Sequence, residues 1–208
     1  KGIAEAFILG EEFIEEDNVC LVLGDNLFVG NSLSDLLLNC VEKLRKNLCS
    51  IVAYEVSDPG RFGVVDFDSD MNAKSIEEKP KKPKSQYAVT GIYFFTNNVV
   101  DLAKKLKPSE RGELEITDIN NIYINNGKMY VEVMDSKSFK WLDTGTFDAL
   151  NEASDYIQSF QKKTHQQISL PDEIAYQNNF INLNQLKKNL PTLSIDLQNY
   201  LLKKYLDS

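Results

Sequence analysis

Short apolar runs rich in β-branched residues alternate along this chain with segments whose apolar residues recur every three or four positions. Strands are expected at the runs, which occupy residues 19–23, 50–56, 63–67, 73–76, 87–95 and 129–134. Helices are expected at the segments, which occupy residues 33–44, 98–106, 116–125 and 147–163. Such alternation is typical of a sheet covered by helices on its faces. The sequence therefore predicts an α/β fold with a mixed, mostly parallel sheet flanked by helices.

The end of the chain carries helical signals without strands between them. One helix is expected to open at Pro171, because proline and the acidic Asp172 and Glu173 suit a first helical turn. Two more are expected at residues 182–190 and 194–206. We therefore divide the chain into an α/β core, residues 1–163, and a small helical C-terminal segment, residues 164–208.

Composition narrows the class of protein. A chain of 208 residues buries enough surface to fold without disulfides, and its three cysteines show no metal-ligand spacing. The net charge of −8 argues against a nucleic acid polymer as partner. No apolar run reaches membrane-spanning length and no signal peptide is visible, so we expect a cytoplasmic protein without a membrane partner. The chain begins with Lys1 inside a helical pattern, which suggests a fragment that starts partway through a domain.

The most informative motif for function is Leu21-Val22-Leu23-Gly24-Asp25-Asn26. An apolar run that stops at glycine and is followed by a carboxylate is typical of a buried parallel strand reaching the carboxyl edge of a sheet. Ligands of open α/β sheets bind at that edge. A single carboxylate there suits Mg²⁺, which takes one or two protein carboxylates together with substrate phosphates.

A second carboxylate, Asp143, lies far downstream in Trp141-Leu142-Asp143-Thr144-Gly145-Thr146. Taken alone, Asp25 is better explained by an Asx turn and Asp143 by a helix cap. Together, and with a basic segment between them, they make a shared Mg²⁺ a competitive hypothesis.

Three further segments offer groups for an anionic, hydroxylated ligand. Glu77-Glu78-Lys79-Pro80 closes an expected strand, and because neighbouring strand residues point to opposite faces, only one glutamate can face a cleft. Arg111 precedes a helix and suits a phosphate, but on the residues alone a surface loop with acidic residues at a helix start explains it better. Gly63 and Gly91 allow close approach of a ligand, or mark structural bulges. The single histidine, His165, lies in a polar run, so no Ser/His/Asp or Cys/His nucleophile system is expected.

These motifs resemble the bacterial sugar-1-phosphate nucleotidylyltransferases that use glucose 1-phosphate and dTTP. The resemblance covers the chain from end to end, and its motifs are VLGDN (22–26), RFGVVDFD (61–68), EEKP (77–80), YAVTGIYF (87–94), KPSERGELEITDIN (107–120) and WLDTGT (141–146). It implies a Rossmann-like nucleotidyltransferase fold whose first strands lie upstream of residue 1. It also implies that Asp25 and Asp143 hold Mg²⁺, and that Lys79 and Arg111 are the catalytic groups that hold the sugar phosphate.

The same resemblance implies a binding site for the sugar and the base. Glu78 and the backbone around Gly63 and Val89 would bind the glucose hydroxyls, and Asn26 would belong to the substrate site. Gly2 would lie near the thymine and deoxyribose. The implied reaction gives dTDP-glucose and pyrophosphate, the first step towards dTDP-rhamnose and the lipopolysaccharide O-antigen, in a homotetramer.

One departure from the family pattern matters for activity. The glycine-rich loop that binds the triphosphate would lie upstream of residue 1, so we expect little or no activity from this chain alone. Alternatives are a related enzyme that uses UTP or CTP, and a non-catalytic truncated product. A metal-dependent glycosyltransferase is disfavoured, because Leu23 and Leu27 stand where an Asp-x-Asp pair would need a second aspartate.

Overall fold

A computed structural model describes residues 2–30 and 32–206 of the chain. The chain divides into two compact units, residues 1–150 and residues 151–208, which we call the α/β unit and the helical unit. The division falls inside helix α6 (Phe147–Thr164), earlier than the boundary at residue 163 expected from the sequence. Residues 151–164 group with the C-terminal helices, although their helical pattern is continuous with the turn before them.

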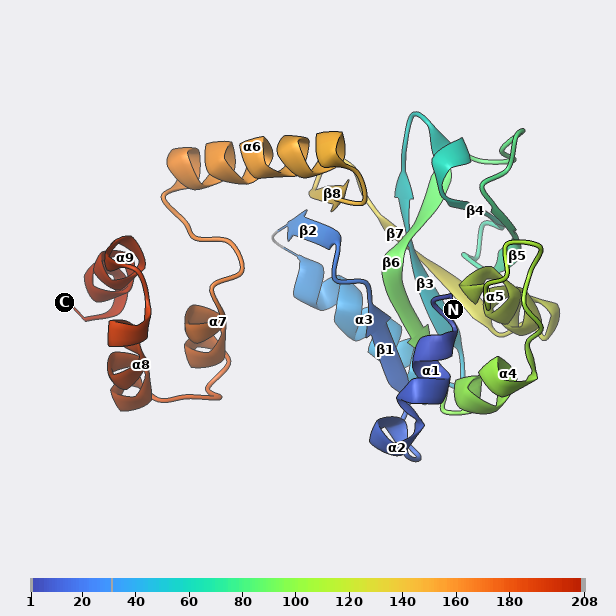
Figure 1. Cartoon of the computed structure of the whole chain (residues 1–208), viewed down its shortest axis with the longest axis horizontal. Coiled ribbons are helices and arrows are strands. Elements are labelled where there is room, and N and C mark those ends of the chain that lie inside the picture. The colour runs from blue at the N-terminus through green and yellow to red at the C-terminus, as the bar shows by residue number, and fades with distance from the viewer. Residues whose placement is uncertain (1, 31, 207–208) are drawn as a thin grey trace. The chain divides into compact units, whose positions relative to one another are not determined.

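The α/β unit is built on a six-stranded sheet (Figure 1). Its strands are β1 (Val19–Val22), β3 (Cys49–Glu55), β4 (Gly63–Phe67), β5 (Ala73–Glu78), β6 (Tyr87–Phe95) and β7 (Met129–Met134). The order is β5-β4-β6-β3-β7, and β1 pairs with β6. The predicted α/β class with a mixed sheet is confirmed.

The pairing is less parallel than expected. Among the described strands β3 and β7 pair in parallel, whereas β1–β6, β3–β6, β4–β5 and β4–β6 are antiparallel. Parallel neighbours need a long crossover, usually a helix. From β3 to β6 the chain passes the short 3₁₀ turn Pro59–Arg61, the hairpin of β4 and β5, and loops, with no α-helix to form such a crossover.

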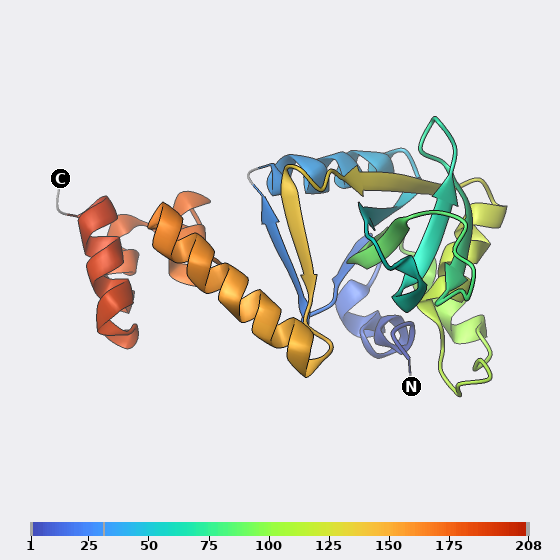
Figure 2. The same cartoon turned by 90° about the horizontal axis from the view of Figure 1, so that it is seen from above.

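Helices cover both faces of this sheet (Figures 1 and 2). One face carries α1 (Glu5–Leu9), α4 (Val99–Lys105) and α5 (Ile116–Asn125), which pack Phe7, Val99 and Ile119 against the strands. The other face carries α3 (Leu33–Arg45), which contributes Leu36 and Cys40. The short helix α2 (Glu11–Ile14) follows α1 directly. The predicted strands at 87–95 and 129–134 and the helix at 116–125 agree with the structure in both bounds.

Two short strands form a separate antiparallel ribbon that the sequence did not predict (Figure 2). They are β2 (Asn26–Gly30) and β8 (Phe139–Asp143), and the register places Asn26 opposite Asp143 and Gly30 opposite Phe139. Most of these residues are half-buried, so neither segment shows the apolar/polar alternation of a half-exposed strand. The ribbon joins the segment after β1 to the WLDTGT segment.

Strand β1 corrects the interpretation of the apolar run before Asp25. It pairs antiparallel with β6, with Val19 opposite Phe95, and Val22 is 54% exposed. The run is therefore neither parallel nor buried. An apolar run of this length fits either strand direction, and only the position of β6 decides between them.

The helical unit contains the rest of α6 together with α7 (Pro171–Gln177), α8 (Leu183–Asn189) and α9 (Ile195–Tyr205). The three predicted C-terminal helices are thus confirmed. Leu170, Leu186, Leu190 and Leu201 form its core. Among the described residues, no helix has the length and apolar content that a membrane span requires.

Candidate functional site

Most of the predicted site residues line a cavity of about 230 Å³ in the α/β unit. Strands β4, β5 and β6, the N-terminal half of α5 and the end of β8 contribute to its lining. Six of the residues singled out from the sequence line it, namely Gly63, Glu78, Lys79, Val89, Arg111 and Asp143. The tertiary structure therefore brings together residues from distant parts of the chain, such as Gly63 and Asp143.

Glu78 is one of the carboxylates that line this cavity. Its Oε2 accepts a hydrogen bond of 2.9 Å from the Thr117 hydroxyl of α5. Gly63 lies opposite Glu78 in the β4–β5 register, and a Cβ at Gly63 would lie 3.4 Å from the same oxygen. Glu77 forms an ion pair with Lys84 instead. The prediction that only one of the two glutamates faces the cleft is consistent with this geometry.

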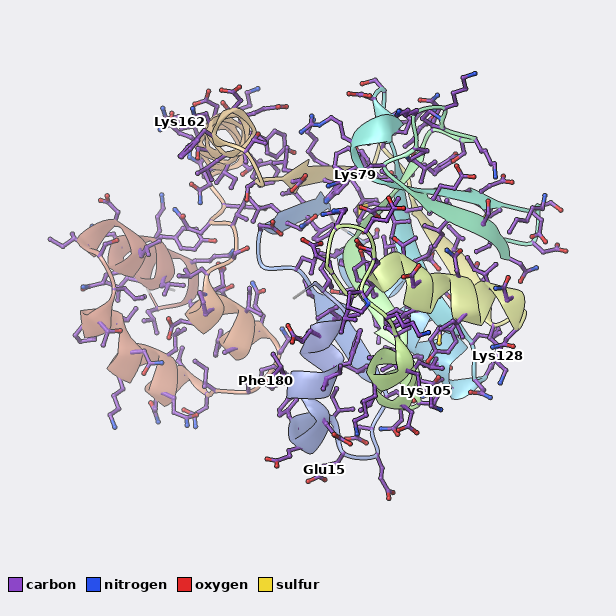
Figure 3. All side chains as sticks on the ribbon, turned by 45° about the vertical axis from the view of Figure 1, so that its right-hand side comes forward. Glu15, Lys79, Lys105, Lys128, Lys162 and Phe180 are labelled. Carbon is purple, nitrogen blue, oxygen red and sulfur yellow. The ribbon has the colours of Figure 1, made fainter. Side chains whose placement is uncertain are left out.

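Lys79 follows β5 directly and has a left-handed backbone with φ of +44°. Its N–H donates to the Phe62 carbonyl at 3.0 Å, which fixes this conformation before Pro80. A non-glycine residue in this region of backbone space is costly and is often found at functional sites. In Figure 3, Lys79 lies at the opposite end of the sheet from Lys105 and Lys128.

Arg111 reaches the cavity from the loop before α5 and is surrounded by carboxylates. Its guanidinium lies 3.1 Å from Glu113, 3.7 Å from Glu115 and 3.9 Å from Glu78, measured between nitrogen and oxygen. The side chain is 49% exposed, so these pairs are individually weak.

Asp25 and Asp143 are held at the same end of the β2–β8 ribbon. Asp143 lies opposite Asn26, and the Asp25 carbonyl accepts from the Thr144 N–H at 2.9 Å and from its hydroxyl at 2.7 Å. One oxygen of each carboxylate is engaged, by the Asn26 amide in Asp25 and by the Gly145 N–H in Asp143.

This donor set suits Mg²⁺. Within residues 2–30 and 32–206, no group of three or more His, Cys, Asp or Glu side chains forms a complete metal cage. Two hard carboxylates without further protein ligands are the usual provision for Mg²⁺, which completes its shell with water and substrate phosphates. The residues present therefore fit the metal predicted from the sequence.

Asp25, Asn26 and Gly2 are not among the residues that line the cavity. Asn26 accepts a 2.7 Å hydrogen bond from the Trp141 indole and donates one to Asp25, so it links the ribbon to the predicted metal ligand. Gly2 has a φ of +103°, and a Cβ there would lie 2.4 Å from the Leu114 carbonyl oxygen. It packs beside the loop before α5, next to Ile3, which does line the cavity.

Three buried polar residues of the cavity were not singled out from the sequence: Thr117 and Asn120 of α5 and Tyr93 of β6. Each is at least nine-tenths buried. Burial, with a smaller effect of the nearby Glu78 charge, raises the pKa of the Tyr93 phenol well above its ordinary value. One signal was available, because Thr117 and Asn120 are polar residues one turn apart on the side of the predicted helix that carries Ile116.

Comparisons with known proteins identify the class. A family model described as nucleotidyl transferase matches residues 1–159, and the chain belongs to this family. UDP-glucose pyrophosphorylase in complex with UDP-glucose superposes with a TM-score of 0.68 at 22% identity, over 78% of this chain and 63% of that one. At that identity the likeness shows the fold alone.

The curated relatives narrow the class further, since they are glucose-1-phosphate thymidylyltransferases. The Neisseria meningitidis protein is 46% identical over 93% of this chain and 66% of its own length. The Mycolicibacterium smegmatis protein is also 46% identical, over 89% of this chain and 63% of its own. A Bacillus anthracis protein of the same description, solved in complex with sucrose, superposes with a TM-score of 0.64 at 41% identity, over 74% of this chain and 60% of that one.

These relatives confirm the resemblance predicted from the motifs. The chain spans about two thirds of the length of the curated relatives that it matches.

Proposed function

We propose that the protein containing this chain joins dTTP and α-D-glucose 1-phosphate to give dTDP-glucose and pyrophosphate. The observation that carries the proposal is the cavity in which Glu78, Lys79, Arg111 and Asp143 meet. Carboxylate acceptors for hydroxyls and cations for phosphate line one small volume there. The names of the relatives supply the nucleotide and the sugar.

The residues suit a reaction that brings two polyanions together. The attacking phosphate oxygen of the sugar is already an anion, so no general base is required, and in-line attack on the α-phosphorus of dTTP releases pyrophosphate. Arg111 and Lys79 offset the repulsion by binding the sugar phosphate. Glu78, oriented by the Thr117 hydroxyl, accepts hydrogen bonds from the glucose hydroxyls.

Asp25 and Asp143 would hold Mg²⁺ at the end of the β2–β8 ribbon where Asn26 pairs with Asp143. When bound, the metal neutralises phosphate charge and orients the reacting groups. The ribbon fixes both carboxylates from the protein side, because the Asn26–Asp143 register and the Thr144 hydrogen bonds to Asp25 connect the two segments.

Substitution of Asp143 tests the metal assignment in the full-length protein. We expect Asp143→Asn to lower kcat/KM at least about 100-fold, since loss of a metal ligand charge weakens both binding and transition-state stabilisation. Asp148→Asn is the matched control, because Asp148 is an exposed carboxylate in the first turn of α6. Unchanged activity and unchanged Mg²⁺ dependence of Asp143→Asn would overturn the assignment.

A nucleotide panel tests the substrate assignment. Full-length protein is incubated with glucose 1-phosphate and Mg²⁺ together with dTTP, UTP or CTP, and pyrophosphate release is followed. We expect dTTP to give the highest kcat/KM. A preference for UTP or CTP would contradict the proposal and favour one of the related activities.

A further inference from the structure

Two buried side-chain oxygens have no hydrogen-bond partner among the described residues, Ser50 Oγ and Asn120 Oδ1. Ser50 lies beside the Cys40 sulfur, a weak acceptor to which its hydroxyl donates. Asn120 has no such neighbour. It is 1% exposed, and it is one of the residues that line the cavity described above.

The neighbours of Asn120 have their polar groups engaged elsewhere. Thr117, one turn earlier on α5, donates its hydroxyl to Glu78. Asn121, the next residue, bonds to both the N–H and the carbonyl of Ile76, at 3.4 and 3.3 Å, and so ties α5 to β5. Asn120 has the same side chain as Asn121 and lines the cavity, but its buried carbonyl oxygen is left without a donor among the described residues.

A buried carbonyl oxygen without a donor destabilises the folded protein, and such atoms are rare in native structures. A ligand that enters the cavity and bonds to this amide removes that cost. A hydroxyl suits the amide in either orientation about its terminal torsion, because a hydroxyl both donates and accepts. An ionised phosphate oxygen only accepts, and the cations Lys79 and Arg111 are available for it.

Building on the proposed function, we propose that Asn120 is a specificity-determining residue whose amide hydrogen-bonds to a hydroxyl of the bound sugar phosphate, directly or through one ordered water. Recognition of this kind discriminates against sugars that lack the hydroxyl, because their binding leaves the buried amide unpaired.

The test compares full-length wild type, Asn120→Leu and the matched control Asn121→Leu. Each is assayed with dTTP and with glucose 1-phosphate or its 2-, 3-, 4- and 6-deoxy derivatives. We expect Asn120→Leu to lower kcat/KM for glucose 1-phosphate about tenfold, the usual effect of one neutral hydrogen bond. For one of the deoxy sugars we expect the kcat/KM of wild type to be lower than for glucose 1-phosphate by a similar factor. The kcat/KM of Asn120→Leu for that sugar should equal its kcat/KM for glucose 1-phosphate. Asn121→Leu should change kcat/KM for all five sugars by a common factor.

A second measurement on wild type covers the case in which Asn120→Leu does not fold. The side-chain amide signals of Asn120 in ¹⁵N-labelled protein should shift when glucose 1-phosphate is added, and not with inorganic phosphate. The inference would be overturned if the Asn120 amide signals do not shift with glucose 1-phosphate. It would also be overturned if Asn120→Leu has the kcat/KM of wild type, or if this substitution lowers kcat/KM by one common factor for all the sugars. Failure of wild type to use glucose 1-phosphate with dTTP would instead overturn the proposed function, and this inference with it.

Discussion

Gly91 shows how a single residue shapes the segment that carries Asp25. It lies in β6, where its carbonyl accepts the Leu23 N–H at 2.9 Å. A Cβ at Gly91 would lie 2.8 Å from Asn26 Cγ and 2.9 Å from Leu23 Cβ. The Asn26 side chain links the Trp141 indole to Asp25, the predicted metal ligand. The absence of a side chain at Gly91 therefore leaves the space that Asn26 occupies.

We expect Gly91→Ala to lower the free energy of unfolding by about 1–3 kcal/mol, because the added methyl group displaces Asn26 and Leu23. Urea denaturation followed by the fluorescence of Trp141, the single tryptophan, measures the change within the α/β unit. Gly24→Ala is the control, since a Cβ there meets nothing within 4 Å. Equal stability of the two variants would contradict the steric argument.

Elements of the helical unit are connected through one buried carboxylate. Glu173 of α7 is 5% exposed and accepts hydrogen bonds from three residues of α9. These donors are Tyr200 at 3.1 Å, Lys204 at 2.7 Å and Tyr205 at 2.8 Å. This interaction supplements a small apolar core, and it fixes the position of α7 against α9.

We expect Glu173→Ala to destabilise the helical unit by about 1–3 kcal/mol, because Tyr200, Lys204 and Tyr205 lose the acceptor that they share. Hydrogen exchange of the α7 and α9 amides should accelerate. Asp196→Asn, an exposed change in the first turn of α9, should alter exchange little. Protection in Glu173→Ala equal to that of wild type would show that the apolar core alone holds these helices together.

Sequence patterns predicted most elements but missed the β2–β8 ribbon. Strand 87–95 and helix 116–125 were predictable because their apolar residues follow one strong period, or one continuous run, over nine or ten positions. The two ribbon strands have five residues each, and each is a strand because it pairs with the other. Such pairing between residues 26 and 143 has no local signal, so only the folded chain shows it.

At the scale of the whole molecule, several buried acids make the native state sensitive to alkali. Burial raises the pKa of the Cys40 thiol from its ordinary 9.0 to about 12. Burial likewise raises the pKa of the Tyr93 and Tyr123 phenols. Above the ordinary pKa values the unfolded chain loses these protons and the native state retains them, so the stability present at lower pH is lost as pH rises.

We therefore expect the free energy of unfolding to fall by roughly 1–3 kcal/mol between about pH 8 and about pH 10.5. Urea denaturation at the two pH values measures the loss. Cys40→Val should make this loss of stability smaller, because valine fills the site without a titrating proton. Constant stability over this range would contradict the linkage argument.

The sequence by itself determined the class of fold, the order of most elements and the types of groups at the site. Periodicity and motif order are local properties, so Glu78, Lys79, Arg111 and Asp143 could be singled out without coordinates. Only the tertiary structure decided which of them share a cavity, that Asn26 supports Asp25 through the ribbon, and that Asn120 presents an unpaired amide. The physical reason is that hydrogen-bond satisfaction and strand direction depend on partners far away in the chain, which a local pattern does not specify.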